Sequence, residues 1–323
     1  MRRRALVLGA LAAPFIHPGS RASAQSYPTR PITLVVPFAS GGPTDILARI
    51  MADAMGERLN GRVVVDNRAG AGGTIAAGQV ARAAPDGYTL LLSNIASNGI
   101  APAAYRTLPY DALEGFTHIG LIGEIPNAIV ANPAFPARTV AELIEHARRN
   151  PGLNYATGGV GTSTHLAAEL LGQMAGVRLT HVPYRGAAPA MTDVMSNQVP
   201  LLFNAVTGLK PHVDAGRLRV IAVTGGRRSD VFPEVPTVAE AGVAGYEAVA
   251  WFGISGPPGL PPEVVMQVNR ALNASLADAA IQRRLVDLGV TPVQLTPDRY
   301  RAYVAEEVRK WQRVGRDINL EQQ

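Results

Sequence analysis

The stretch PITLVVPFASGGPTDILAR, residues 31–49, decides how we interpret this chain. The apolar run Ile32–Phe38 predicts a buried strand, and the apolar residues of Thr44–Leu59 recur with the period of a helix. Gly41 and Gly42 stand between the two elements. A strand that turns through glycines into a helix is a common cradle for an anion, because the first amides of the helix have no partner within it.

The same order of elements repeats along the chain. We expect a strand over 62–66, a glycine loop over 70–73, a helix over Thr74–Arg82 and a strand over 88–94. This βαβαβ order favours an α/β fold in which helices cover a parallel sheet. A second region continues the alternation, with strands expected at 153–159, 179–184, 199–204 and 218–224, and helices near 140–150, after Ser163, over 188–196 and near 208–215.

Two segments, at 118–133 and 246–259, are extended and have no helical period. We interpret them as crossings between two lobes, with a ligand cleft at the carboxyl ends of the strands. A single large sheet is the alternative, which the length of the chain disfavours. The expected bounds are 25–124 and 252–323 for lobe 1, which helices at 262–275, 278–288 and 297–317 complete, and 125–251 for lobe 2.

The first residues have the order of a secretory signal. Three arginines precede an apolar run from Ala5 to Ile16 and small residues at 22–24, so we expect cleavage after Ala24. The apolar run is shorter than the roughly 20 residues that span a bilayer. A retained amphipathic anchor is the alternative, and the paired arginines leave both the Sec and the Tat route open. We therefore expect a protein of the periplasm.

Composition excludes several classes of function. Arginines 2, 3, 4 and 21 account for four of the five net positive charges, so the exported part carries a formal charge of +1. A nearly neutral chain without a basic run argues against nucleic acid as a partner. The sequence contains no cysteine, which excludes disulfides, thiolate metal sites and a cysteine nucleophile. We expect no cofactor.

The loop at Phe38–Asp45 matches no nucleotide motif. No lysine follows its glycines as in a P-loop, and the spacing is not G-x-G-x-x-G. Pro43 fits the first helical position, Thr44 adds a hydroxyl, and Asp45 falls where a carboxylate can cap the start of its own helix. The loop is thus either an anion site or a tight turn with a cap.

The stretch DNRAGAGGTIAAG, residues 66–78, imitates a dinucleotide fingerprint. Gly70 and Gly72 have the required spacing, but Ile75 stands where the third glycine belongs, and the loop follows the second strand rather than the first. We expect it to form a second backbone rim of the cleft.

The second region holds a matching loop in TGGVGTSTHLAAELL, residues 157–171. Thr162 or Ser163 is expected to cap the following helix, with His165 in its first turn. His165 and Glu169 can share a helix face, but two groups make a poor zinc site, so no metal is expected. Ser163 lacks a G-x-S-x-G elbow, which disfavours a hydrolase. We interpret the other histidines of the exported part, at 118, 146, 181 and 212, as structural.

Taken together, these motifs resemble those of the Bug-type solute-binding proteins of tripartite tricarboxylate transporters. The matching stretches run in family order from residue 27 to near the C-terminus: YPTRPITLVVPFASGGPTDILAR, VVVDNRAGAGGTIAA, APDGYTLLLSN, LPYD, GTSTHLAAELL, HVPYRGAAPAMTD, GRLRVIAVT, VPTVAEAG and WFGISGPPGLP. The resemblance implies a two-lobe periplasmic binding protein fold of type II, the Venus-flytrap arrangement, that closes on a small organic carboxylate.

In this family, backbone groups and hydroxyls of the first loop and of the second-lobe loop typically hold the carboxylate. The resemblance also implies permease subunits of a tripartite tricarboxylate transporter as partners, and a protein that is not an enzyme. We expect a monomer. The ligand-binding residues that follow for this chain are Phe38, Ala39, Ser40, Gly41, Gly42, Thr44, Asp45, Ser93, Asn94, Gly161, Thr162, Ser163, His165, Phe203 and Asn204.

Two positions depart from the family's pattern. Many relatives have proline where this chain has Ser40, and an acid is common where it has Asn204. Ser40 would add a hydroxyl to the cradle, and Asn204 would make a ligand ammonium group less favourable. The ligand stays open among mono-, di- and tricarboxylates, acidic amino acids, aromatic acids and nicotinate-like compounds. Two other functions also stay open: a ligand-loaded sensor partner of a membrane receptor, and an exported serine hydrolase that uses Ser163 or Ser40.

Overall fold

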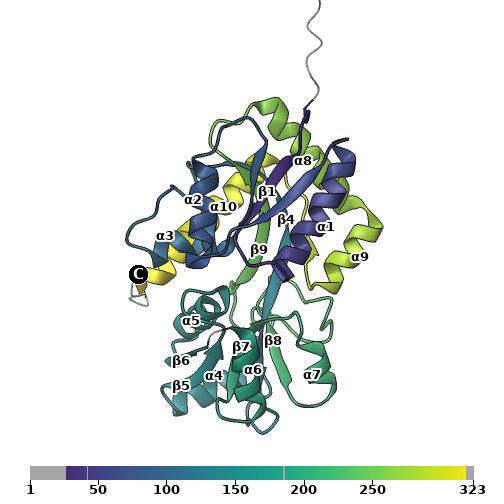
Figure 1. Cartoon of the computed structure of the whole chain (residues 1–323). Coiled ribbons are helices and arrows are strands. Elements are labelled where there is room, and N and C mark those ends of the chain that lie inside the picture. The colour runs from purple at the N-terminus through teal and green to yellow at the C-terminus, as the bar shows by residue number, and fades with distance from the viewer. Residues whose placement is uncertain (1–26, 42, 185, 318–323) are drawn as a thin grey trace, which may run out of the picture.

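The computed structural model describes residues 27–317 except 42 and 185, and Figure 1 shows an upper and a lower lobe. The expected export signal and Gly42 of the first loop lie outside the described residues. Among the helices of the described part, none combines the length and apolar character needed to cross a bilayer.

The upper lobe is built on a mixed sheet. β1 (Ile32–Val36) pairs in parallel with β2 (Val63–Asn67) and with β3 (Thr89–Asn94). β3 pairs antiparallel with β9 (Val249–Gly256), and β9 pairs antiparallel with the first part of β4 (Thr117–Ala131). The expected parallel βαβαβ unit is therefore present, and the two extended crossings complete its sheet.

Helices lie on both sides of this sheet (Figure 1). The sequence predicts the five longest of them to within two residues at each end, because their apolar periods are regular. It does not predict the π-helical segment and short helix that follow β3. The elements, with the short strand that pairs with β4, are α1 (Pro43–Arg58), η1 (Ala71–Gly73), α2 (Thr74–Ala81), η2 (Ala96–Ile100), α3 (Ala101–Ala104), α8 (Pro262–Ala277), α9 (Ala279–Asp287), β10 (Thr291–Pro292) and α10 (Pro297–Asp317).

The lower lobe has its own group of strands. β7 (Leu201–Ala205) and β8 (Arg219–Val223) pair antiparallel with the second part of β4. β5 (Leu153–Thr157) pairs in parallel with both β7 and β6 (Leu179–Pro183). The helix expected near 208–215 is shorter than predicted. The helices of this lobe are α4 (Val140–Arg149), α5 (Ser163–Ala175), α6 (Ala187–Met195) and α7 (Lys210–Asp214).

The strand β4 carries the chain from the upper lobe to the lower one. Its residues 117–126 pair with β9, whereas its residues 127–131 pair with β7 and β8. The strands of the described residues thus form one hydrogen-bonded sheet, in which β8 and β10 branch from β4, but the change of partners along β4 divides them into two groups. The chain returns to the upper lobe through β9 (Figure 1). The predicted α/β fold of two lobes with two extended crossings is confirmed.

Strand directions place two sets of loops face to face. β1, β2 and β3 run in the same direction as β4, because β3 and β4 both pair antiparallel with β9. Their carboxyl ends therefore point toward the lower lobe. β5, β6 and β7 run opposite to β4, so their carboxyl ends point toward the upper lobe. The glycine-rich loops after β1 and after β5 face each other across the junction.

A buried carboxylate joins the returning strand to the last helix. Trp251 on β9 and Trp311 on α10 donate their indole N–H groups to the same oxygen of Glu307, at 3.0 and 2.9 Å. Lys310 pairs with the other oxygen. Because the chain has only two tryptophans, its tryptophan fluorescence reports on this one cluster.

Candidate functional site

The loop after β1 presents its glycine to open space. Gly41 has a φ of 83°, and a Cβ built on it would meet no atom within 4 Å. Ala39 and Ser40 beside it are exposed, and Thr44 in the first turn of α1 is half-buried. The loop is therefore accessible at the edge that faces the lower lobe.

Asp45 holds this loop in shape. Its carboxylate accepts the Gly41 N–H at 2.9 Å and the Asn67 side-chain amide at 3.1 Å, and it pairs with Arg49 at 3.0 Å. The Asn67 amide also donates to the Phe38 carbonyl oxygen at 3.0 Å. Because Arg49 and the Gly41 N–H stabilise the anion, the pKa of Asp45 is lowered from its usual value. Asp45 thus caps the start of its helix, as predicted, and its oxygens are engaged within the loop.

The loop after β2 is the second glycine-rich turn at this edge. The consecutive residues Gly70, Ala71, Gly72 and Gly73 all have positive φ values, of 141°, 45°, 62° and 95°. A Cβ on Gly73 would lie 3.0 Å from Cβ of Pro37, so this turn packs directly against the loop after β1. This position suits a second rim of the cleft, whose contact with a ligand stays a prediction.

The loop after β5 repeats the construction of the first loop. Gly161 has a φ of 71°, and a Cβ there would likewise meet no atom within 4 Å. Its N–H donates to Nδ1 of His165, four residues on, at 3.2 Å, just as the glycine of the first loop donates to Asp45. The Thr162 hydroxyl accepts the backbone N–H of His165 at 3.2 Å, so of the two predicted caps it is Thr162 that starts α5. Ser163 is half-buried beside it.

Three rings stack behind this lower loop. The rings of His165 and His181 lie 4.0 Å apart at an angle of 16°, and His181 also stacks on Tyr155 at 5.1 Å and 19°. Nε2 of His181 lies 2.6 Å from the hydroxyl of Thr157. That hydroxyl bonds both the N–H and the carbonyl oxygen of Gly159, at 3.1 and 3.2 Å. The stack therefore contacts the loop at two points.

Both histidines of the stack are neutral at pH 7. Burial, and then the neighbouring His181, lower the pKa of His165 to about 4. Burial lowers the pKa of His181 to about 4. Since Nδ1 of His165 accepts a hydrogen bond, the single proton of this ring sits on Nε2, 3.8 Å from the carboxylate of Glu169. Glu169 in turn accepts the hydroxyl of Tyr155.

Ser93 and Asn94 lie inside the upper lobe. The Ser93 hydroxyl is 2.8 Å from the hydroxyl of Tyr300 and 3.0 Å from that of Ser255. Oδ1 of Asn94 accepts the backbone amides of Ala96 and Ser97 at the start of η2, at 2.8 and 3.3 Å. Both side chains are buried, at 0% and 2% exposure. They hold the end of β3 in place, and we leave them out of the site proposed below.

Phe203 and Asn204 stand near the end of β7, at the edge that faces the upper lobe. Phe203 is fully buried and packs edge-on against Tyr155, with ring centroids 5.5 Å apart. Asn204 is also buried, and its amide donates to the carbonyl oxygen of Ala205 at 2.9 Å. Phe203 thus supports the ring stack, and contact of either residue with a ligand stays a prediction.

Two residues that contribute to the shape of the loops, His181 and Asn67, are not predicted as site residues from the sequence. The sequence alone places His181 among the structural histidines and gives Asn67 no role. Asn67 is the last residue of β2, which runs parallel to β1, so the rule that parallel strands end at one edge would also have indicated it. His181 is the middle residue of β6, and the same rule does not indicate it.

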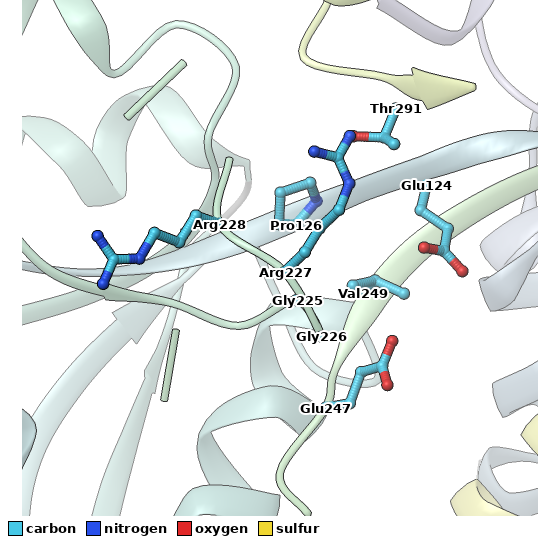
Figure 2. Close-up of a pocket in the computed structure, with 9 residues that line it drawn as sticks. All are labelled: Glu124, Pro126, Gly225, Gly226, Arg227, Arg228, Glu247, Val249 and Thr291. Atoms are coloured by element: carbon cyan, nitrogen blue, oxygen red, sulfur yellow. The ribbon is translucent and has the colours of Figure 1, made fainter. Parts of the chain in front are cut away.

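A cavity of about 230 Å³ lies where the two lobes join (Figure 2). Arg227 reaches from the loop after β8 to the Thr291 hydroxyl at 3.0 Å, and Arg228 points away from the two glutamates. A carboxylate here would meet Glu124 and Glu247, so we do not place the ligand in this cavity. Its lining consists of Glu124, Pro126, Gly225, Gly226, Arg227, Arg228, Glu247, Val249 and Thr291, and includes none of the predicted site residues.

The positions of the histidines and acids also bear on two other kinds of site, a metal site and a catalytic serine. Within residues 27–317, apart from 42 and 185, histidines and acids form no group of three that would hold a metal ion. The two ring nitrogens of His165 face the Gly161 N–H and Glu169. His165 is therefore engaged with the loop and its own helix rather than with Ser163.

Comparisons with known proteins identify the family. Residues 47–320 match the model of the tripartite tricarboxylate transporter family receptor. The structure is similar to that of the periplasmic binding protein BugD, with a TM-score of 0.76 and 38% identity over 92% of this chain and 100% of that one. It is also similar to R. palustris Rpa4515 with adipate (TM-score 0.78, 37% identity, 90% and 97% of the chains).

A third similar structure is MatC (Rpa3494) from Rhodopseudomonas palustris with bound malate. Its TM-score is 0.74 and its identity 34%, over 90% of this chain and 100% of that one. The predicted resemblance and the periplasmic-binding-protein fold are confirmed. This chain belongs to the tripartite tricarboxylate transporter receptor family, the Bug-type periplasmic solute-binding proteins.

Proposed function

We propose that this protein captures a small organic carboxylate between its lobes and presents it to the permease subunits of a tripartite tricarboxylate-type transporter. One observation carries the proposal: two glycine-rich loops, each leading into a helix N-terminus, face each other across the junction. The first amides of α1 and α5 have no partner within their helices, and the positive end of the helix dipole favours an anion.

The donors of these two loops suit a ligand of low charge. Neither Phe38–Asp45 nor 158–165 contains lysine or arginine, and Arg49 nearby is paired with Asp45. The hydroxyls of Ser40 and Thr44 in the upper loop are neutral donors. A molecule with one carboxylate for each loop fits this arrangement better than a densely charged anion. Adipate and malate, bound by two similar proteins, each have two carboxylates.

Closure of the lobes would signal capture. The lobes are joined by β4 and β9, and a ligand that bridges both loops stabilises only the arrangement in which both sets of donors reach it. We place the lobes at 25–124 with 252–323 and at 125–251. The change of partners on β4 between Pro126 and Asn127 supports the first border.

We further propose that the protein works in the periplasm as a monomer, after cleavage near Ala24, and catalyses no reaction. The periplasmic relative BugD supports the location. The engaged nitrogens of His165 argue against a serine hydrolase, which needs a base beside its nucleophile.

A thermal-shift panel tests the proposed ligand class. The protein is freed of carried-over ligand and heated with adipate, malate and a set of mono- and tricarboxylates, each beside its methyl ester. A ligand at 100 times its dissociation constant adds about 2.7 kcal/mol, which at roughly 2–4 °C per kcal/mol is a shift of several degrees. We expect at least one acid to raise the melting temperature while its ester does not. Equal shifts with acid and ester, or no shift at all, would overturn the proposal.

Genetic and kinetic tests separate the other functions. If deletion of the protein abolishes gene induction by the carboxylate but leaves its uptake intact, the protein is a sensor partner instead. Hydrolysis of ester or amide substrates that Ser163→Ala abolishes would make it a hydrolase.

A further inference from the structure

The two facing loops share one hydrogen-bonding pattern but use different acceptors. In each loop a glycine N–H donates to a side chain four residues on, Gly41 to Asp45 and Gly161 to His165. The carboxylate of Asp45 accepts throughout the neutral range. An imidazole nitrogen accepts only while it carries no proton. The lower loop therefore depends on the protonation of a side chain where the upper loop does not.

We propose that His165 is a positioning residue that sets the shape of the lower ligand loop, Gly158–Ser163, and that protonation of His165 releases this loop. The inference rests on the proposed function in that it takes this loop to be half of the carboxylate site. His165 then acts on the ligand through Gly161 and does not touch it.

The contacts hold the loop at two points. His165 fixes Gly161 through Nδ1 at 3.2 Å, and His181 contacts the Thr157 hydroxyl that bonds both polar backbone atoms of Gly159. A proton on Nδ1 of His165 would set a donor against the Gly161 N–H. One anchor of the loop would be lost, and its free amides would no longer be held in one arrangement.

Three neighbouring side chains determine the pH at which His165 is protonated. Glu169 on α5 lies 3.8 Å from Nε2 of His165 and favours the charged ring. Burial and the stacked His181 on β6 oppose it, and Tyr155 on β5 already donates to Glu169. Burial and His181 prevail, since the pKa of His165 is lowered to about 4. The bond to Gly161 is present at neutral pH and is lost as the pH falls toward 4.

Two substitutions of His165 separate the effect of losing the hydrogen-bond acceptor from the effect of protonating it. His165→Asn places Oδ1 where Nδ1 now lies, so it accepts from Gly161 and cannot be protonated in this range. His165→Gln places its amide near the position of Nε2, so it cannot reach Gly161. His146→Asn is the matched control, because His146 lies on α4 and packs its ring on Phe135.

Amide hydrogen exchange of Gly161 in the ligand-free protein, followed by NMR between pH 7 and pH 4, tests the inference. After correction for intrinsic exchange, protection in the wild type should fall about threefold by pH 4, where half of the His165 rings are protonated, because losing one hydrogen bond of about 1 kcal/mol changes protection about fivefold. His146→Asn should behave like the wild type. His165→Asn should keep its protection at both pH values, and His165→Gln should lack it at both. Equal protection in wild type and His165→Gln, or a parallel fall in His165→Asn, would overturn the inference.

Adipate titrations at pH 7 separate this inference from the proposed function. We expect adipate to bind His165→Gln about fivefold more weakly than the wild type, with His165→Asn restoring the affinity. If adipate binds all variants equally, the positioning role is overturned while carboxylate capture stands. If the exchange results hold and no carboxylate of the panel binds, the positioning role stands and the proposed function fails.

Discussion

Replacing Asp45 with asparagine removes the charge that holds the loop after β1. The carboxylate now accepts the Gly41 N–H, the Asn67 amide and the guanidinium of Arg49. An asparagine in its place keeps one acceptor oxygen and turns an NH₂ group toward at least one of these donors. At least one charge-assisted hydrogen bond is lost, and a donor then faces a donor.

The expected loss in the free energy of unfolding follows from these contacts. A hydrogen bond to a charged group contributes about 1.5–3 kcal/mol, and an acid in the first turn of a helix about 0.3–1 kcal/mol. The side chain of Arg49 is 54% exposed, so water screens its ion pair and the pair adds little. The loop borders solvent, so the lower ends apply, and Asp45→Asn should lower the free energy of unfolding by about 2 kcal/mol. At roughly 2–4 °C per kcal/mol, the melting temperature should fall by about 4–8 °C.

Differential scanning calorimetry at pH 7 measures this change, with Asp53→Asn as the control on an exposed acid of the same helix. The folded-state pKa of Asp45 is lowered, so its contribution is fully present above the usual carboxyl value of 3.8 and is lost as the pH falls below it. The difference between wild type and Asp45→Asn should therefore shrink below about pH 3.8. A melting temperature within about 1 °C of the wild type at pH 7, or an equal fall in Asp53→Asn, would show that the Asp45 carboxylate does not hold this loop.

The remaining predictions concern the buried framework. Burial lowers the pKa of His118 to about 4, so as the pH falls this side chain takes up its proton in the unfolded chain before it does so in the folded one. His118 should therefore lower the free energy of unfolding, measured in urea, by about 2 kcal/mol between pH 7 and pH 5. Gly253→Ala should lower the unfolding free energy by about 3 kcal/mol, because its Cβ would overlap the Tyr300 hydroxyl. Glu307→Leu leaves two buried indole N–H groups without their acceptor, at about 1–3 kcal/mol each, and should shift both the melting temperature and the tryptophan emission.

Each of these has a matched control. His118→Asn should make the decline between pH 7 and pH 5 smaller by about 2 kcal/mol, while His165 and His181 still contribute to it, and an unchanged decline would contradict the assignment. Gly99, like Gly253, has no positive φ, and its Cβ would lie no nearer than 3.4 Å to the atoms around it, so a loss in Gly99→Ala as large as that of Gly253→Ala would argue against a steric cause. Glu306→Leu changes an exposed acid of the same helix as Glu307, and an emission shift of equal size there would count against the shared carboxylate.

The regular elements and the two loops are predictable because their signals are local. Apolar periods mark the strands and helices, and glycines mark the turns between them. Asp45 as a cap also follows from spacing, since it stands three residues after Gly42 at the start of a helix. The facing of the loops follows in turn, once the two extended crossings are recognised, from the rule that parallel strands end at one edge.

The interior of the candidate site depends on contacts that spacing does not encode. His181 reaches His165 because β5 and β6 pair with Tyr155 opposite His181, a register that depends on the whole sheet. The bond from Gly161 to Nδ1 of His165 depends on one rotamer of a side chain. Ser93 stands at a strand end as predicted, but the alternation of the strand turns its hydroxyl toward Tyr300 and Ser255.

The distance between the two lobes shows whether a carboxylate is captured between the facing loops. Because the chain has no cysteine, Asp53→Cys on α1 and Ala188→Cys on α6 allow one spin label on an exposed position of each lobe, outside the predicted site residues. Pulsed electron–electron double resonance then measures the distance between the two labels. It is recorded for the protein alone, with the strongest acid of the thermal-shift panel, and with the methyl ester of that acid. Capture between the facing loops predicts a shift to shorter distances with the acid and none with the ester. An acid that raises the melting temperature but leaves the distance distribution unchanged would contradict the account.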